Sequence, residues 1–297
     1  HIYDAIIIGG GASGLMCAIT AKKLNHSKKI AIIEKNDRLG KKLMSTGNGR
    51  CNLTNHCISP DKYVGSFKKQ SEKIFERFSG DKMANIFKDL GLLSFHDNEG
   101  RYYPISKHAA SVLDVLRLQV ETLGIDVFTE QNVNSIKKVS NGFRISSDDS
   151  EKKYDFICNK LVIANGSKAA PKLGGNASAI DYLKNFGHKV VSFSPALCPV
   201  KVKSDVLKTL KGLRVTGEAR LYGEKGQLVK AETGEIQFTE NSLSGICVFN
   251  LSLFAKPNDK IVLDLLPDYS ENELIKIIRQ HISCLLYTSP SPRDMRR

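Results

Sequence analysis

The order of elements in the first 34 residues constrains the fold more than any other feature of this sequence. An apolar run, residues 3–8, has the composition of a strand that is buried in a parallel sheet. Apolar residues then recur at helical spacing over residues 15–25, and a second short apolar run occupies residues 30–33. Strand, helix and strand in this order predict a β-α-β unit and an α/β fold.

Glycines at fixed positions join the first strand to the helix. Gly9, Gly11 and Gly14 have the spacing G-x-G-x-x-G, and Glu34 ends the second strand about twenty residues after the last of them. Gly9 permits the tight turn, Gly11 lets a pyrophosphate approach the backbone, and Gly14 lets the helix pack closely on the strand. The helix N-terminus attracts the phosphates, and a carboxylate at position 34 can accept hydrogen bonds from a ribose. An acid there disfavours a 2′-phosphate, so the unit predicts binding of FAD or NAD.

A second glycine-rich stretch, KKLMSTGNGRCNLTN at residues 41–55, follows this unit. An NAD dehydrogenase has no need of it, whereas FAD continues from its ribose toward the isoalloxazine ring and needs a further binding surface. Backbone N–H groups and cationic side chains can line that path: Lys41, Ser45, Thr46, Gly47, Gly49 and Arg50. The alternative interpretation is an ordinary surface loop, and chemistry alone leaves both open.

The same stretches carry a family resemblance. IIIGGGASGLMCA and then EKNDRLGKKLMSTGNGRCNLTN resemble the BaiN/YhiN-type FAD-dependent oxidoreductases, some of which are known as aminoacetone oxidases. The resemblance continues in residues 100–112, 186–200 and 234–252, and it extends to about residue 283. It implies a Rossmann-like FAD-binding domain and an inserted, β-rich, partly barrel-like second domain that closes over the flavin.

Spacing and resemblance together give a candidate set of FAD-binding residues. The set is Gly9, Gly11, Ala12, Ser13, Gly14, Glu34, Lys35, Lys42, Ser45, Gly47, Gly49, Arg50, Cys51, Asn52, Val133, Ala164 and Gly166. Two positions depart from related flavoproteins: Asn165 follows Ala164 where threonine is usual, and Ser242 stands where the family has glycine. No catalytic residue is identified.

The remaining pattern predicts further elements and the domain boundaries. Helices are expected within residues 71–93 and over 106–123, followed by a hairpin over 133–147 and a buried strand over 156–164. Short alternating segments then predict antiparallel sheet up to residue 254. We expect the FAD-binding domain at residues 1–193, the second domain at 194–283, and a disordered tail without function at 284–297. The resemblance implies a later segment that completes the flavin site, so we expect weaker FAD binding than in a full-length relative.

The cysteines and histidines do not predict a metal or redox site. The seven cysteines form no dense framework, which favours a reducing, cytoplasmic location. Cys51 and Cys57 lack the spacing of a flavin disulfide reductase, so Cys51 is interpreted as a packing residue near the flavin. The histidines form no ligand pair. His96 and His108 flank Arg101 and Tyr103 and can reach the substrate side, although His108 lies on a predicted helix and is interpreted as structural.

The predicted function is hydride transfer between flavin N5 and a small-molecule substrate or NAD(P)H. No second G-x-G-x-x-G follows residue 14, so NAD(P)H is expected to bind only transiently. The alternatives are a flavoprotein of tRNA modification, an amine oxidase of the aminoacetone type that uses dioxygen, and a non-catalytic flavin protein. The net charge is +13, but its lysines are spread along the chain, so neither a nucleic-acid partner nor a membrane is expected. The oligomeric state stays open.

Overall fold

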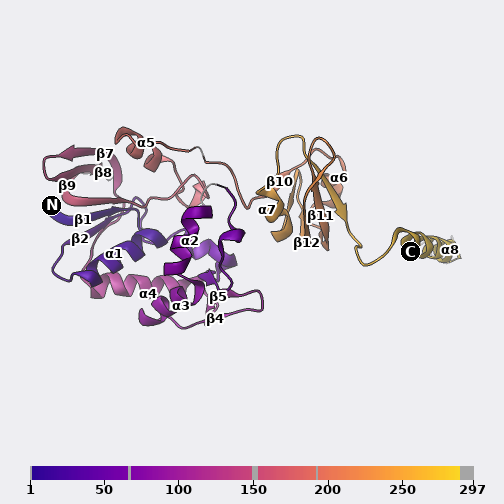
Figure 1. Ribbon diagram of the computed structural model, residues 1–297, viewed down its shortest axis with the longest axis horizontal. Helices are drawn as coiled ribbons and strands as arrows, with labels where there is room; N and C mark the ends of the chain where they lie inside the picture. The colour runs from indigo at the N-terminus through magenta and orange to yellow at the C-terminus, as the bar shows by residue number, and fades with distance from the viewer. Residues whose placement is uncertain (1, 66–67, 149–152, 192, 288–297) are drawn as a thin grey trace, which may run out of the picture. The chain divides into compact units, whose positions relative to one another are not determined.

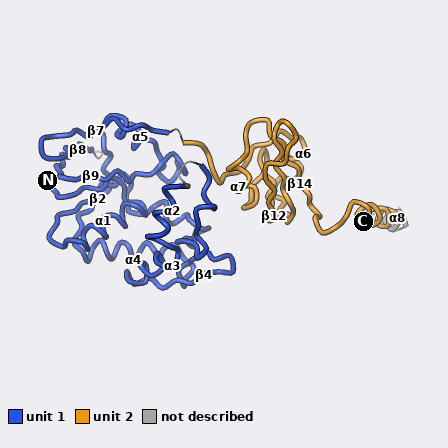
Figure 2. Tube along the Cα trace, viewed as in Figure 1, with its two compact units in different colours: residues 1–191 blue, residues 192–297 orange. Residues whose placement is uncertain are grey.

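The computed structural model describes residues 2–65, 68–148, 153–191 and 193–287. The chain divides into two compact units, residues 1–191 and residues 192–297 (Figure 2). This division lies close to the expected domain boundary after residue 193. No helix within the described ranges is long and apolar enough to cross a membrane.

A six-stranded sheet forms the centre of the first unit, in the order β6-β2-β1-β9-β8-β7 (Figure 1). Its strands are β1 (Ile2–Ile8), β2 (Ile30–Ile33), β6 (Asp126–Phe128), β7 (Asn132–Val139), β8 (Gly142–Asp148) and β9 (Lys153–Ile163). Strand β1 pairs in parallel with β2 and β9, with Ile6 opposite Ala31 and Leu161. Strands β7 and β8 form the expected antiparallel hairpin, which continues antiparallel onto β9. The carboxyl ends of β2, β1 and β9 therefore lie side by side at one edge.

Helices cover one face of this sheet and join it to a small second sheet. The helices of the unit are α1 (Ala12–Leu24), α2 (Lys68–Arg77), α3 (Gly80–Asp89), α4 (Ala109–Thr122) and α5 (Ser178–Asn185). The small antiparallel sheet has the order β3-β5-β4, with β3 (Thr54–Asn55), β4 (Ser94–His96) and β5 (Arg101–Pro104). Three short 3₁₀ segments cover Leu43–Gly49, Pro60–Lys62 and Pro171–Leu173. Figure 1 shows α1 and α4 on the same side of the six-stranded sheet.

Alternation along β1 explains why both faces of the sheet are apolar. Ile7 is fully buried in a core shared with α1 and α4, including Leu15 and Leu113. Ile6 is buried on the opposite face, in a core that includes Phe156 of β9. Successive side chains of a strand point to opposite faces, so a run without polar residues requires cover on both sides.

The second unit contains a five-stranded antiparallel sheet in the order β10-β13-β12-β11-β14. Its strands are β10 (Val200–Lys201), β11 (Arg214–Tyr222), β12 (Leu228–Phe238), β13 (Ser242–Ser244) and β14 (Lys260–Asp264). Its helices are α6 (Val206–Leu210), α7 (Ile246–Ser252) and α8 (Glu271–Tyr287). The predicted fold class, a Rossmann-like α/β domain with a β-rich second part, is confirmed.

Three local expectations were wrong. Residues 246–252 form helix α7 and not sheet, because Cys247, Val248 and Leu251 bury one helical face against the sheet. Helix α8 continues to Tyr287, so the chain does not lose regular structure at residue 284, and residues 288–297 lie outside the described residues. His108 precedes α4 as its N-cap residue and is not part of the helix.

Candidate functional site

A cavity of about 470 Å³ lies in the first unit, at the carboxyl ends of β1, β2 and β9. Its wall includes residues that directly follow each of these strands: Gly9, Glu34 and Ala164. In open parallel sheets, ligands bind outside the carboxyl ends of the strands. The volume is in the usual range for small-molecule and cofactor sites.

The three glycines of the turn are needed for three different reasons. Gly9 has φ of +105°, and a Cβ there would lie 2.6 Å from the Ala164 carbonyl oxygen. A Cβ on Gly14 would lie 1.9 Å from the Gly9 carbonyl oxygen, so Gly14 lets α1 approach the turn. A Cβ on Gly11 would meet no protein atom within 4 Å. Gly11 therefore leaves space that the protein itself does not use.

The N-terminus of α1 opens onto the same space. Gly11 is its N-cap residue and provides no side-chain cap, and the first turn contains no acidic residue. Ala12 and Ser13 line the cavity and are exposed. The first N–H groups of a helix lack acceptors within the helix and carry partial positive charge. This end of the cavity is therefore suited to a pyrophosphate.

Glu34 is buried, with 8% of its surface exposed, and its carboxylate binds the turn. Oε2 accepts the Gly10 N–H at 2.7 Å, and Oε1 accepts the Asn36 backbone N–H at 2.9 Å and its Nδ2 at 2.6 Å. A carboxylate has about four acceptor positions. The position that remains on Oε2 can accept a ribose hydroxyl, as the sequence predicts.

The glycine-rich stretch folds into a turn with several left-handed residues. Gly47, Asn48, Gly49 and Cys51 have φ of 55°, 55°, 81° and 59°. The Cys51 N–H closes the turn by donating to the Thr46 carbonyl oxygen at 3.0 Å. Glycine adopts such φ values without steric cost, which explains two of the glycines in this motif. The positive φ of Cys51 is costly, and such strain concentrates at functional sites.

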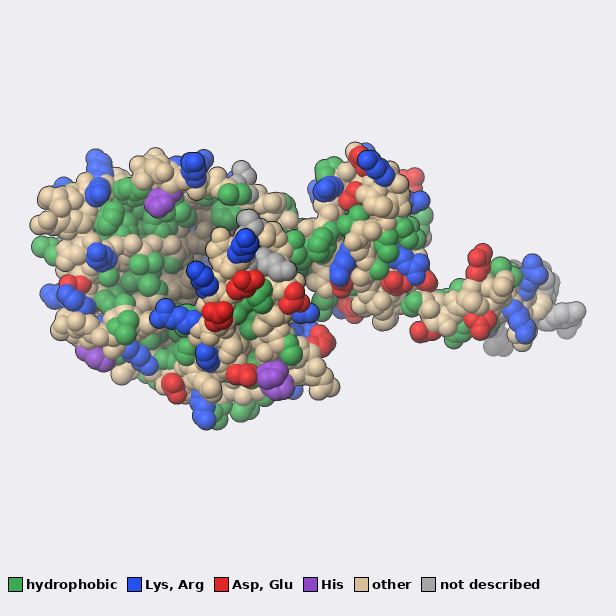
Figure 3. All heavy atoms as spheres, in the orientation of Figure 1, with side chains coloured by type: hydrophobic (Ala, Val, Ile, Leu, Met, Phe, Trp, Pro, Cys, Tyr) green, Lys and Arg blue, Asp and Glu red, His purple; other side chains and the backbone are tan. Residues whose placement is uncertain are grey.

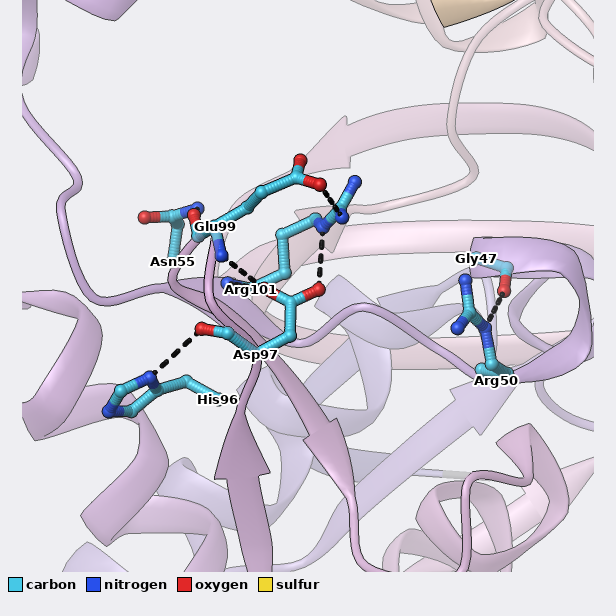
Figure 4. A network of polar contacts seen from close by, with 7 residues as sticks. All are labelled: Gly47, Arg50, Asn55, His96, Asp97, Glu99 and Arg101. Atoms are coloured by element: carbon cyan, nitrogen blue, oxygen red, sulfur yellow. Dashed lines mark hydrogen bonds and ion pairs between the residues drawn. The ribbon is translucent and has the colours of Figure 1, made fainter. Parts of the chain in front are cut away.

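Arg50 lies outside the cavity wall. Its Nε donates to the Gly47 carbonyl oxygen at 3.3 Å (Figure 4), and its guanidinium lies 4.7 Å from the centroid of the Tyr103 ring. Its role at the cofactor stays a prediction. Figure 4 also shows Arg101 paired with Asp97 and Glu99, at 2.9 and 2.6 Å.

The structure brings together most of the candidate residues. Those that line the cavity are Gly9, Gly11, Ala12, Ser13, Glu34, Lys35, Lys42, Cys51, Asn52, Val133, Ala164 and Gly166. Those that do not are Gly14, Ser45, Gly47, Gly49 and Arg50. Lys41 and Thr46 also line the cavity. His96, His108 and Arg101 do not line it, and His96 stacks instead on His56 at 5.2 Å between ring centroids.

Sequence reasoning missed several polar residues of the wall. Gly10 and Asn36 bind Glu34, and Gln131, Asn165 and Ser178 also line the cavity. Asn165 was visible as a departure from the usual threonine. Gly10 lies inside the glycine motif and Asn36 lies two residues after Glu34, so both are close to predicted residues, whereas the fold alone brings Gln131 and Ser178 to the site.

Burial keeps two groups of the wall in their neutral forms. It raises the pKa of the Cys51 thiol, against an opposing effect of a hydrogen bond with Thr46. It also raises the pKa of Tyr182, whose hydroxyl donates to the Val133 carbonyl oxygen at 2.5 Å. Cys51 is therefore poorly suited to act as a thiolate. Across the described ranges, no group of three or more His, Cys, Asp or Glu side chains could hold a metal ion.

The residues present fit FAD. Gly11 leaves room for a pyrophosphate, the uncapped α1 attracts it, and Glu34 retains an acceptor for a ribose. The Asn165 Oδ1 atom is buried and has no hydrogen-bond partner in the protein. This atom has less than 1 Å² of accessible surface, so it is not an acceptor that faces the cavity.

The fold and the site define a dinucleotide-binding flavoprotein of the Rossmann class. Within that class, the chain belongs to the family described as HI0933-like protein Rossmann domain, whose profile matches residues 3–246. The predicted BaiN/YhiN-type resemblance is confirmed, and the protein is an FAD-dependent oxidoreductase.

Named relatives fall into two groups. The chain is 32% identical over 291 residues to the 3-dehydro-bile acid delta(4,6)-reductase of Clostridium scindens, covering 95% of this chain and 69% of the relative. It is 24% identical over 281 residues to the ribosomal RNA dihydrouridine synthase of Haemophilus influenzae, covering 93% and 68%. A flavocytochrome c3 fumarate reductase in its open conformation shares the fold, with a TM-score of 0.50 and 13% identity over 72% of this chain and 47% of that one.

Proposed function

We propose that this enzyme reduces a carbon–carbon double bond that is conjugated to a carbonyl group in a small organic molecule. The observation that carries this proposal is a chemical agreement between its two kinds of relative. A 3-dehydro-bile acid with double bonds at positions 4 and 6 is a conjugated ketone, and dihydrouridine arises by saturating a double bond next to a ring carbonyl. The two substrates differ in size and class, but the bond that changes is of the same kind.

Bound FAD would supply hydride-transfer chemistry between NAD(P)H and the unsaturated substrate, with the second hydrogen of the reduced product coming from solvent as a proton. The protein holds and orients the cofactor. Gly11 and the α1 N-terminus bind the pyrophosphate, and Glu34 binds the ribose. Thr46 and Cys51 belong to the turn on the path toward the flavin ring, and apolar side chains such as Phe87 keep water out of that part of the cavity.

NAD(P)H is the proposed hydride source, and it binds transiently in the same cleft. The sequence contains one G-x-G-x-x-G turn, which FAD uses. We also propose a reducing, cytoplasmic location. This is supported by six of the seven cysteines, which are unpaired: Cys17, Cys51, Cys57, Cys158, Cys198 and Cys247.

We favour a small molecule over RNA as the substrate of this enzyme. Identity is higher to the bile acid reductase, at 32%, than to the RNA-modifying enzyme, at 24%. On the face shown in Figure 3, lysine and arginine side chains (blue) are interspersed with acidic ones (red) and form no continuous patch. RNA is the second candidate, favoured by the net charge of +13 and by the name of that relative.

The test is an anaerobic half-reaction with the flavin-loaded protein. The flavin is first reduced with one equivalent of NADH or NADPH, and a 4-en-3-one steroid, cyclohexenone or a ribosomal RNA transcript is then added. The proposal predicts that an unsaturated ketone reoxidises the flavin and gains two hydrogens by mass spectrometry. Reoxidation by the RNA alone would select the second candidate. Reduction of the flavin by an amine such as aminoacetone, without any response to unsaturated ketones, would overturn the proposal in favour of an oxidase.

A further inference from the structure

Two arginines near the glycine-rich turn differ in whether their charge is compensated (Figure 4). Arg101 pairs with Asp97 at 2.9 Å and with Glu99 at 2.6 Å. Arg50 is exposed, and its contacts within the described ranges are one backbone oxygen and one aromatic ring, with no carboxylate at ion-pair distance. The positive charge of Arg50 is therefore both uncompensated and accessible.

The guanidinium of Arg50 is nevertheless held in a defined plane. Its Nε donates to the Gly47 carbonyl oxygen at 3.3 Å, and its face lies 4.7 Å from the centroid of the buried Tyr103 ring. The turn rests on the same ring, because a Cβ on Gly47 would lie 3.6 Å from a Tyr103 ring carbon. With Nε and one face occupied, the two terminal nitrogens remain free as a fork of N–H donors.

A second uncompensated cation contacts the same face of the small sheet. Phe95 of β4 lies opposite Tyr103 of β5, so their side chains share one face, and their ring centroids are 6.3 Å apart. Lys107 Nζ lies 5.5 Å from the Phe95 centroid, and this lysine is exposed without an acidic partner in the described chain. Tyr102 points to the opposite face and binds Asp81 there. One face of the small sheet is thus cationic and aromatic, and the acid lies on the other.

The position of Arg50 shows which kind of ligand its charge can serve. Arg50 does not line the cavity, but the next two residues, Cys51 and Asn52, do. A group bound by Arg50 therefore lies at the rim of the cavity. The negative charge of oxidised FAD is on its pyrophosphate, which is assigned to Gly11 and the N-terminus of α1. The charge of Arg50 is left for a different ligand that extends out of the cavity.

We propose that Arg50 is a substrate-binding residue whose guanidinium fork binds a carboxylate of the substrate, with Lys107 as a second, weaker contact. This rests on the proposed function, because the carboxylate belongs to the same small unsaturated ketone. Guanidinium and carboxylate match each other in two parallel hydrogen bonds. The Phe95 and Tyr103 rings offer apolar surface to the carbon chain beside the carboxylate. Two cations over one pair of rings form a small site, whereas a nucleic acid requires a continuous basic surface.

The test compares two ligands that differ only in charge: a 4-en-3-one steroid with a side-chain carboxylate, and its neutral amide. Calorimetric titration of the flavin-loaded, oxidised protein measures the affinity for each without turnover. The wild type should bind the acid about tenfold more tightly than the amide. Arg50→Gln should remove this preference and leave the affinity for the amide unchanged, Arg50→Lys should retain part of it, and Lys107→Gln should reduce it a few-fold. Arg101→Gln is the matched control, and it should keep the preference because its charge is already paired.

A wild-type protein that binds the acid no more tightly than the amide, or binds neither, would overturn the proposal. An equal loss of both ligands in Arg50→Gln would also overturn it, since the residue would then act by contact and not by charge. Titration of flavin-stripped Arg50→Gln with FAD should give the wild-type affinity, and a weaker one would assign Arg50 to the cofactor instead. If both steroids bind but neither is reduced, the proposed function fails, and the difference in affinity still decides the carboxylate site.

Discussion

The glycines of the G-x-G-x-x-G turn have different roles, although the motif alone does not distinguish them. Gly14 serves packing within the protein, and Gly11 serves a ligand. The sequence predicted both roles from spacing. It did not identify Asn36, which binds Glu34 only two residues away, and it could not predict the contact of Asn165 with Ser178, which the fold brings to it.

Replacing Gly14 by alanine should destabilise the protein even without FAD. The new Cβ would lie 1.9 Å from the Gly9 carbonyl oxygen, so α1 has to move away from the turn. We expect a loss of about 2 kcal/mol or more in the free energy of unfolding, measured by urea titration of flavin-free protein. Thr20→Ala, at an exposed position of the same helix, is the control and should have little effect. Equal stability of the two variants would show that the close approach of α1 is unimportant.

A contact between α3 and β5 should make stability depend on pH. His56 and Tyr102 both bind the Asp81 carboxylate, at 2.7 and 2.8 Å, and they hold the pKa of Asp81 below its usual range. The stabilisation is therefore complete above the ordinary aspartate pKa, about 4, and is lost as the pH falls through the lowered value. Asp81→Asn should lower the thermal midpoint slightly at pH 7 and leave it unchanged near about pH 2. A difference that persists in acid would contradict this account.

At the scale of elements, helix α4 packs in the core of the first unit and forms part of the cavity wall. Leu113 is 2% exposed in the core, whereas Leu118 of the same helix is 58% exposed. Leu113→Ala should lower the free energy of unfolding by about 3 kcal/mol, because it leaves a cavity in a packed core. Leu118→Ala should change it by less than about 0.5 kcal/mol. Urea unfolding of both variants checks this, and similar losses would mean that α4 is not packed as described.

Elements with strong apolar periodicity were predictable, and short ones were not. The apolar runs of β1 and β2 and the amphipathic pattern of α4 identified their elements within a few residues of the observed ends. Helix α7 is only seven residues long and begins with an apolar run of four, residues 246–249, which periodicity alone cannot distinguish from a buried strand. The long-range pairing of β3 with β5 likewise leaves no local pattern.

For the whole molecule, the first unit contains a cavity whose chemistry matches FAD, and the family assignment agrees with it. The sequence predicted the cofactor and the fold class, because a dinucleotide site depends on backbone geometry that glycine spacing reveals. It could not identify the substrate, since specificity depends on side chains brought together from distant elements.

The central claim is that this cavity holds FAD, and Gly11→Val tests it most directly. The new side chain meets no protein atom where its Cβ would lie, so the thermal midpoint of the flavin-free protein should fall only slightly, by the cost of valine at the N-cap of α1. It occupies the space assigned to the pyrophosphate, so the purified variant should contain almost no flavin by visible absorbance. Thr20→Val, which adds the same side chain on the exposed face of α1, should retain flavin as the wild type does. A Gly11→Val protein with wild-type flavin content would contradict the account.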